Sequence, residues 1–236
     1  MATVIQDLIT TVRATPLIET TAKFWSDDEL LAICIRGIKD LWRDIADLKQ
    51  EHYLTTDITN VSLQPNQNQL TGVPQDVHKI YMIEPRDLSE NGANHGLLFM
   101  PMPYNNNQFQ LARSRGAMEP TNDTIYYALA GAGAPVSAPT IVTAPKVTSQ
   151  VLVAFTYVPV LPNLIISSSI PIPGEADNAL AAWITAFARA KEREDRSPDP
   201  AWLNIYQTEK LHLLQSLGLR QYQEAEYATA TFSEYW

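Results

Sequence analysis

The feature that most constrains the fold is a helix start in the segment Trp25-Ser26-Asp27-Asp28-Glu29-Leu30-Leu31. Ser26 and Glu29 have the spacing of a capping box, in which each side chain accepts a hydrogen bond from the other residue's backbone N–H. Trp25 and Leu30 occupy the flanking positions, where two apolar side chains fix how the chain enters the helix. The acidic residues in the first turn also stabilise the helix, because their negative charges lie at the positive end of its dipole. We therefore predict a structural helix cap formed by Trp25, Ser26 and Glu29.

Apolar residues recur at helical spacing in four segments, which predicts four helices. The second helix contains Gly37, which costs about 1 kcal/mol relative to Ala, and a close backbone crossing is the ordinary explanation. Gly218 follows the fourth helix and is a natural C-cap. The four helices are expected near residues 3–13, 26–50, 174–195 and 200–217.

The segment 55–160 has a different composition, in which Thr, Val, Ile and Tyr increase and Pro, Asn and Gln interrupt. This pattern is typical of short strands joined by turns. Residues 64–69 are polar and predict a loop or hairpin tip, whereas residues 105–108 are compatible with either a short helix or a loop. Strands are expected at 78–83, 124–129, 140–143 and 150–158.

Together these patterns predict an α+β fold, with a helical bundle body and a central antiparallel β segment. We expect a single domain at 1–218 with a β-rich excursion at about 55–160. An extended C-terminal arm is expected at 219–236, because this segment loses the helical pattern of apolar residues.

Five aromatic residues lie in this arm: Tyr222, Tyr227, Phe232, Tyr235 and Trp236. Exposed Tyr and Trp side chains are often the centres of protein interfaces. Two interpretations remain open at this point. Either the arm folds back on the core of its own chain, or it binds a neighbouring chain, in which case these five are partner-binding residues.

The composition limits the classes of function. The 236 residues carry a formal net charge of −9, which argues against a protein that grips DNA or RNA, because such proteins have a basic face. An acidic surface is compatible with a wall past which DNA slides, and equally with solubility alone. The sequence shows neither a secretory signal nor an apolar run long enough to span a bilayer, so we expect a protein made in the cytoplasm and no membrane partner.

The sequence contains no recognisable catalytic or metal-binding motif. Its four histidines (His52, His78, His95 and His212) lack the spacing of three or four residues that places two ligands on one helix face. Cys34 is the only cysteine and lies in an apolar helical stripe, so we expect a buried thiol and no intrachain disulfide. We predict no catalytic residue, no cofactor and no metal. The alternative is a soluble α/β enzyme whose site is assembled from scattered residues such as His95, Glu84 and Asp87.

Several short segments, taken in order, resemble the head-to-tail adaptor (connector) proteins of tailed double-stranded DNA bacteriophages. The capped tryptophan at the start of a long helix is the most specific of them, and the order of all of them covers most of the chain. The matching segments are Trp25-Ser26-Asp27-Asp28-Glu29-Leu30-Leu31, Val73-Pro74-Gln75-Asp76-Val77-His78-Lys79-Ile80, Tyr126-Tyr127 and Tyr157-Val158-Pro159, followed by the two closing helices.

The resemblance implies a structural virion protein at the head–tail junction. Such proteins form a ring, commonly of twelve copies, beneath the portal, where they continue the DNA channel and help to retain the packaged genome. The implied partners are the portal protein, neighbouring copies and the next tail or neck protein, while DNA passes through without sequence-specific binding. The arm would then contact the portal, with Tyr235 and Trp236 as its main contact residues. A tail terminator or tail-tube gatekeeper ring is an alternative with the same geometry and a different neighbour.

Overall fold

The computed structural model describes residues 3–19, 24–48, 50–86, 96–116, 124–131, 139–193 and 196–232; for residue 50 and residues 218–232 it describes the backbone only. The chain divides into a helical unit, formed by Met1–His52 and Leu161–Trp236, and a β unit, formed by Tyr53–Val160. Helices and two sheets occur together, which confirms the α+β class. The β unit coincides closely with the excursion expected at 55–160. No described helix is both long enough and apolar enough to cross a membrane.

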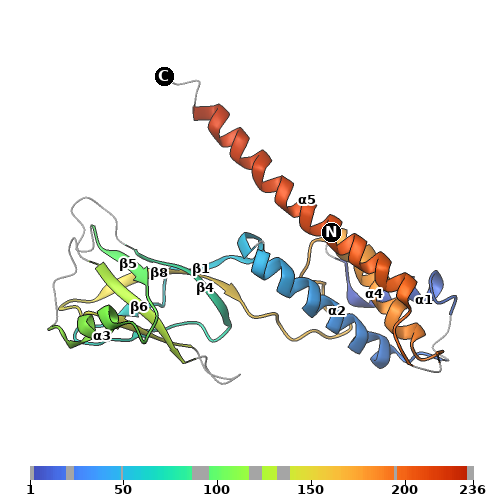
Figure 1. The fold of residues 1–236 in the computed structure, drawn as a ribbon, viewed down its shortest axis with the longest axis horizontal. Helices are drawn as coiled ribbons and strands as arrows, with labels where there is room; N and C mark the ends of the chain where they lie inside the picture. Colours follow the sequence, from blue (N-terminus) through green and yellow to red (C-terminus); the bar gives the residue numbers. More distant parts are fainter. Residues whose placement is uncertain are drawn as a thin grey trace. The chain divides into compact units, whose positions relative to one another are not determined.

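Within the described residues, the helical unit contains four α-helices and short 3-10 turns (Figure 1). In α2 the buried face repeats every three or four residues, through Leu30, Cys34, Ile38, Leu41 and Ile45, as an amphipathic helix requires. The helices are α1 (Ile5–Ala14), α2 (Asp27–Leu48), α4 (Asp177–Arg189) and α5 (Pro200–Phe232), and the 3-10 turns are η1 (Gln50–Tyr53), which runs into the β unit, and η2 (Gly174–Ala176).

A close approach at Gly37 fixes how α2 packs on α4. A Cβ atom added to Gly37 would lie 2.6 Å from Cδ1 of Trp183, closer than any side chain allows. The Trp183 indole N–H also donates to the Ile33 carbonyl at 3.0 Å. The close crossing predicted at Gly37 is therefore present, but its partner is an indole ring rather than a second backbone.

Two predicted helix ends are wrong. The helix predicted to stop at Gly218 continues to Phe232, so the segment 219–232 is helical rather than an extended arm. The cost of one glycine in a helix, about 1 kcal/mol, is small beside the strong helix formers that follow it, which include Leu, Arg, Gln, Glu and Ala. The helix predicted at 174–195 is shorter, since α4 ends at Arg189 and the following residues form turns.

The β unit contains two sheets. Strand β8 is central in the first sheet, where it pairs antiparallel with β1 and β2 along one edge and with β4 along the other. The second sheet has the order β5-β6-β7, and β5 runs parallel to β6, so the prediction of a wholly antiparallel segment is wrong for this pair. The strands are β1 (Thr55–Asp57), β2 (Ser62–Leu63), β3 (Leu70–Thr71), β4 (Val77–Pro85), β5 (Leu98–Pro101), β6 (Thr124–Gly131), β7 (Thr140–Ala144) and β8 (Val151–Pro159).

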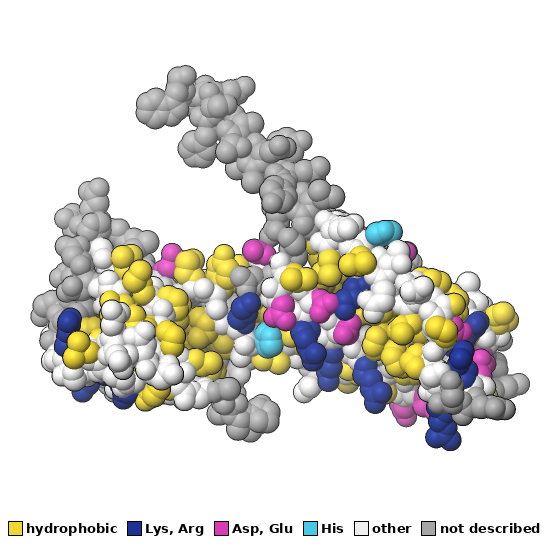
Figure 2. Space-filling model, in the orientation of Figure 1, with side chains coloured by type: hydrophobic (Ala, Val, Ile, Leu, Met, Phe, Trp, Pro, Cys, Tyr) yellow, Lys and Arg dark blue, Asp and Glu magenta, His cyan; other side chains and the backbone are white. Residues whose placement is uncertain are grey.

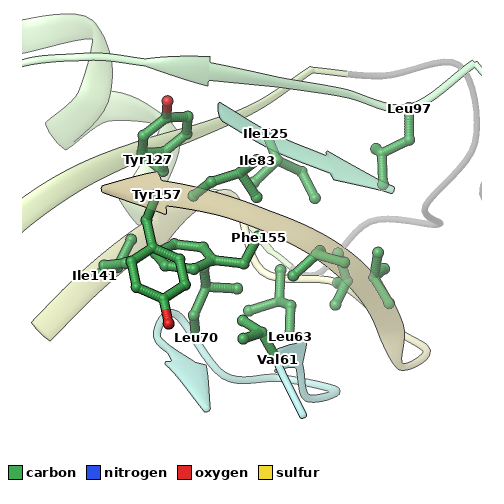
Figure 3. Close-up of a cluster of buried hydrophobic side chains, with 13 residues drawn as sticks. Val61, Leu63, Leu70, Ile83, Leu97, Ile125, Tyr127, Ile141, Phe155 and Tyr157 are labelled. Carbon is green, nitrogen blue, oxygen red and sulfur yellow. The ribbon is translucent and has the colours of Figure 1, made fainter. Parts of the chain in front are cut away.

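The core of the β unit lies between these two sheets (Figure 3). Alternate residues of β8, such as Val153, Phe155 and Tyr157, point into it because side chains alternate across a strand. Ile125 and Ile141 enter the same core from the second sheet. The opposite face of the second sheet is covered by the short helix α3 (Asn107–Ser114).

Two loop predictions can be compared with the structure. The polar residues 64–69 form the tip between β2 and β3, and Asn66 there has a positive φ of 58°, a conformation that Asn tolerates in turns. For residues 105–108 the helical alternative is correct. Asn106 caps α3 by accepting a hydrogen bond from the Gln108 N–H at 2.8 Å.

Candidate partner-binding site

The predicted capping box at the start of α2 is confirmed. The Ser26 N–H donates to Glu29 Oε2 at 2.9 Å, and the Glu29 N–H donates to Ser26 Oγ at 3.2 Å. Trp25 is 4% exposed, and its indole N–H donates to the Ala188 carbonyl at 2.8 Å. Leu30 is fully buried. The cap therefore fixes the start of α2 and also ties it to the end of α4.

An ion pair strengthens this tie. Lys191 Nζ lies 3.0 Å from Glu29 Oε1 and donates to the Phe24 carbonyl at 2.7 Å. The hydrogen bond from the Ser26 backbone, followed by that from Lys191, holds the pKa of the Glu29 carboxyl below its usual value. Glu29 thus stays charged and neutralises Lys191.

A buried arginine on α1, Arg13, connects α1 to the start of α2. One terminal nitrogen of Arg13 lies 2.8 Å from Glu19 Oε2, and the other lies 2.6 Å from Asp27 Oδ1. The second nitrogen also donates to the Trp25 carbonyl at 2.8 Å. Since Arg13 is only 8% exposed, these partners compensate a charge that is largely removed from water. Three helices of the unit therefore meet at the start of α2.

Beside this junction the surface is hollowed by a groove between α2 and the end of α4, with a volume of about 530 Å³. Apolar side chains form much of its lining, among them Ile33 and Phe187, together with Ala32 and Ala190. On the face drawn in Figure 2, hydrophobic side chains lie next to basic ones in the region that α2 and α4 occupy in Figure 1. We call this feature the α2–α4 groove.

The rim of the α2–α4 groove is basic. Arg36 and Arg196 line it, and neither makes an ion pair with a carboxylate of the described part of the chain. Lys191 is offset by Glu29, so the two arginines leave a net positive charge on a protein whose formal charge is −9. Apolar lining residues beside guanidinium groups that lack a partner in the described part of the chain suit an aromatic or aliphatic side chain that has a carboxylate close by.

A second charged cluster joins α2 to α5. The Tyr206 hydroxyl donates to Asp40 Oδ2 at 2.5 Å, and Lys210 Nζ lies 2.7 Å from Asp40 and 2.6 Å from Asp44. Burial raises the pKa of Asp40, but the hydrogen bonds from Lys210 and Tyr206 outweigh it and lower the pKa overall. Burial and the bond to Asp40 raise the pKa of Tyr206. The cluster locks the two helices in parallel alignment.

The structure tests only part of the predicted arm. Tyr222, Tyr227 and Phe232 belong to the backbone of α5, and their side chains lie outside the described residues. Tyr235 and Trp236 lie outside the described residues altogether. Their role as partner-binding residues therefore stays a prediction.

The enzyme alternative gains no support from the described residues. Glu84 lies on β4, whereas Asp87 and His95 fall outside the described part of the chain. No group of three His, Cys, Asp or Glu side chains within the described ranges could hold a metal ion. Burial raises the pKa of the Cys34 thiol to about 12, as expected for a buried and unreactive cysteine.

Sequence reasoning missed the α2–α4 groove, because two segments about 150 residues apart in the chain form it. The signal that could have indicated it is a small residue at an exposed helix position. Ala32 is exposed on α2, and Ala190 follows the end of α4, so both leave room where a larger side chain would fill the space.

Comparisons with known proteins do not place the chain in a family: no family model matches the sequence, and no curated protein matches it significantly.

Proposed function

We propose that this chain is a structural virion protein that forms a homo-oligomeric ring beneath the portal of a tailed bacteriophage and joins the head to the tail. The observation that carries the proposal is the order of the elements. A short helix is followed by a long helix that begins at Trp25 and its capping box, then by the β unit, and then by two closing helices. This order agrees with the head-to-tail adaptors that the sequence resembles.

The length of α5 supports a role in assembly. Ser216 donates to Glu175 at 3.1 Å, which places it beside η2, at the start of the antiparallel helix α4. The residues of α5 after 217 therefore continue past the N-terminal end of α4 (Figure 1). A helix that is longer than its own bundle can reach a second chain.

In this function the ring has a protein neighbour on each side and DNA in its channel. We place the portal protein on one side and the next tail or neck protein on the other, and the resemblance implies twelve copies. The net charge of −9 supports a channel wall that repels phosphate and lets DNA move without sequence-specific binding. The mature location is the virion, after synthesis in the host cytoplasm.

Electron microscopy of the purified protein, alone and mixed with the portal protein encoded by the same genome, tests the proposal. We expect rings on the portal and monomers or weak assemblies without it, because the charge on each copy opposes spontaneous closure. Rings that bind a tail protein and ignore the portal would instead indicate a tail terminator or gatekeeper. A protein that remains at 26.4 kDa with both partners present would contradict the ring.

A truncated chain, ending at residue 232, tests the arm within the same function. We expect its melting temperature to match that of the full chain and its assembly on the portal to be lost, because the arm serves a contact between chains. If the truncated protein unfolds, residues 233–236 belong to the core of their own chain, and their assignment to an interface is wrong.

A further inference from the structure

We propose that the α2–α4 groove binds the C-terminal arm, residues 219–236, of a neighbouring copy of the same chain. This inference rests on the proposed ring, since it names the contact that links one copy to the next. It assigns a function to the groove, which the role in joining head to tail does not by itself require.

The chemistry of the arm matches that of the groove. The arm carries its five aromatic residues among three glutamates, Glu224, Glu226 and Glu234, with Arg220 as its only basic residue. The groove offers apolar lining residues and the guanidinium groups of Arg36 and Arg196, which have no ion-pair partner among the described residues. Aromatic side chains suit the apolar lining, and carboxylates nearby suit the arginines, which bind carboxylates through two parallel hydrogen bonds.

The geometry of α5 excludes the groove of the same chain. The first turn of α5 lies beside the groove, because the Asp199 N–H donates to the Ala186 carbonyl at 3.0 Å and Arg196 lines the rim. The arm begins at residue 219, 19 residues after the start of α5, and at 1.5 Å per residue this places it roughly 28 Å along the helix, with Phe232 roughly 48 Å from the start. An uninterrupted α5 therefore carries the arm away from its own groove, and the acceptor must be another copy.

The arm and the groove lie toward opposite ends of α5, so the contact between two copies is heterologous: it joins two different surfaces. Each copy uses its arm on one neighbour and its groove on the other, and such head-to-tail contacts close into a ring when the rotation between copies permits. A single contact of this kind can be weak in solution, and closure strengthens it because the last contact forms within one assembly. This agrees with the expectation that rings form on the portal rather than in dilute solution.

Cross-linking of the full-length protein tests the inference. In the variant carrying Ala32→Cys and Ser233→Cys, oxidation should give a ladder of disulfide-linked oligomers, because Ala32 is an exposed residue of the groove. Cys34 can remain, since it is buried. The matched control carries Gln207→Cys and Ser233→Cys, with the acceptor cysteine exposed on α5 and away from the groove. We expect about tenfold more ladder than in this control, as contact raises the local concentration.

Charge reversal separates specific docking from random collision. Arg36→Glu with Arg196→Glu should reduce the ladder about five- to tenfold, because like charges then face the arm. Glu224→Arg with Glu226→Arg in the same chain should restore it. Equal ladders in the groove variant and the Gln207 control, or no response to charge reversal, would overturn the inference.

The outcome is distinguishable from that of the proposed function. Rings on the portal that give no cross-link between positions 32 and 233 would keep the proposed function, assign the arm to the portal and overturn the groove contact. A groove-dependent ladder that forms open filaments, with no rings on the portal, would keep the contact and refute the head–tail role.

Discussion

The helical unit and the β unit each bury an apolar core, but they differ in the ion pairs that accompany it. The ion pairs that the structure describes all belong to the helical unit. Most of them connect α2 to another helix or to the turn that follows α4, and Arg189 with Asp199 connects α4 to the residue before α5. The described core of the β unit is instead an apolar cluster between two sheets. The stabilisation that ion pairs and caps provide depends on pH and salt, whereas the stabilisation from apolar burial depends mainly on how well the side chains pack. The comparison therefore predicts that the units respond to different perturbations.

The largest expected effects come from one core substitution in each unit. Phe155 in the β unit is fully buried, and Trp25 in the helical unit is 4% exposed. Truncation of either to Ala should lower the free energy of unfolding by about 3–5 kcal/mol. All five tryptophans belong to the helical unit, so their fluorescence reports on that unit alone.

We expect Phe155→Ala to leave the midpoint of the tryptophan transition unchanged, while far-ultraviolet circular dichroism shows earlier loss of the β unit. Trp25→Ala should do the reverse, with the remaining tryptophans as the probe. If both variants shift both signals equally, the two units unfold in one cooperative transition, and the prediction that they respond to different perturbations is wrong.

Arg13→Met tests whether the helical unit depends on a buried charge. The substitution removes a cation from Glu19 and Asp27, and the free energy of unfolding should fall by about 3 kcal/mol, because the largely buried Glu19 carboxylate loses the charge that compensates it. Lys39→Met, at an exposed position on α2, serves as the control and should change stability by less than about 0.5 kcal/mol. Equal urea midpoints for the two variants would show that the Arg13 contacts contribute nothing measurable.

Gly37→Ala tests the packing of α2 on α4. Alanine improves helix propensity by about 1 kcal/mol, but its methyl group would meet the Trp183 ring, and overpacking of this kind costs about 1–3 kcal/mol. We expect a net loss of stability in thermal melts. The sign should reverse in a Trp183→Leu background, where the ring is absent; a stabilised Gly37→Ala protein that retains Trp183 would contradict the observed contact.

Local signals in the sequence predicted the cap, because its determinants lie within a few residues of each other. The glycine itself indicated the close approach at Gly37, but its distant partner, Trp183, was not predicted. The continuation of α5 past Gly218 was missed because one conspicuous glycine was weighed above the many helix formers after it. The parallel pairing of β5 with β6 and the α2–α4 groove both depend on distant segments meeting. The pattern of apolar residues within one segment does not indicate which distant segment it will contact.

Ser26→Ala tests the cap alone and should cost about 1 kcal/mol, because the Glu29 N–H loses its acceptor. Urea denaturation followed by tryptophan fluorescence measures this loss in the helical unit. Ser26→Asp is the matched control, since a carboxylate can accept the same hydrogen bond. Equal losses in the two variants would show that the hydroxyl does not act as a cap.

The smallest expected effect is a change in the pH dependence of stability on Asp40→Asn. Burial raises the pKa of Asp40, but the hydrogen bonds from Lys210 and Tyr206 lower it further, so its pKa in the folded protein lies below the unfolded value of about 3.9. A lowered pKa contributes stability above the unfolded value, and this contribution is lost as the pH falls through the folded value. The stability of the parent should therefore decline on acidification below about pH 4, and the Asn variant should decline less. Asp47→Asn, at an exposed position on the same helix, provides the control and should follow the parent. If Asp40→Asn also follows the parent, the lock between α2 and α5 does not depend on the charge of Asp40, and the contrast between an ion-paired helical unit and an apolar β unit is weaker than the structure indicates.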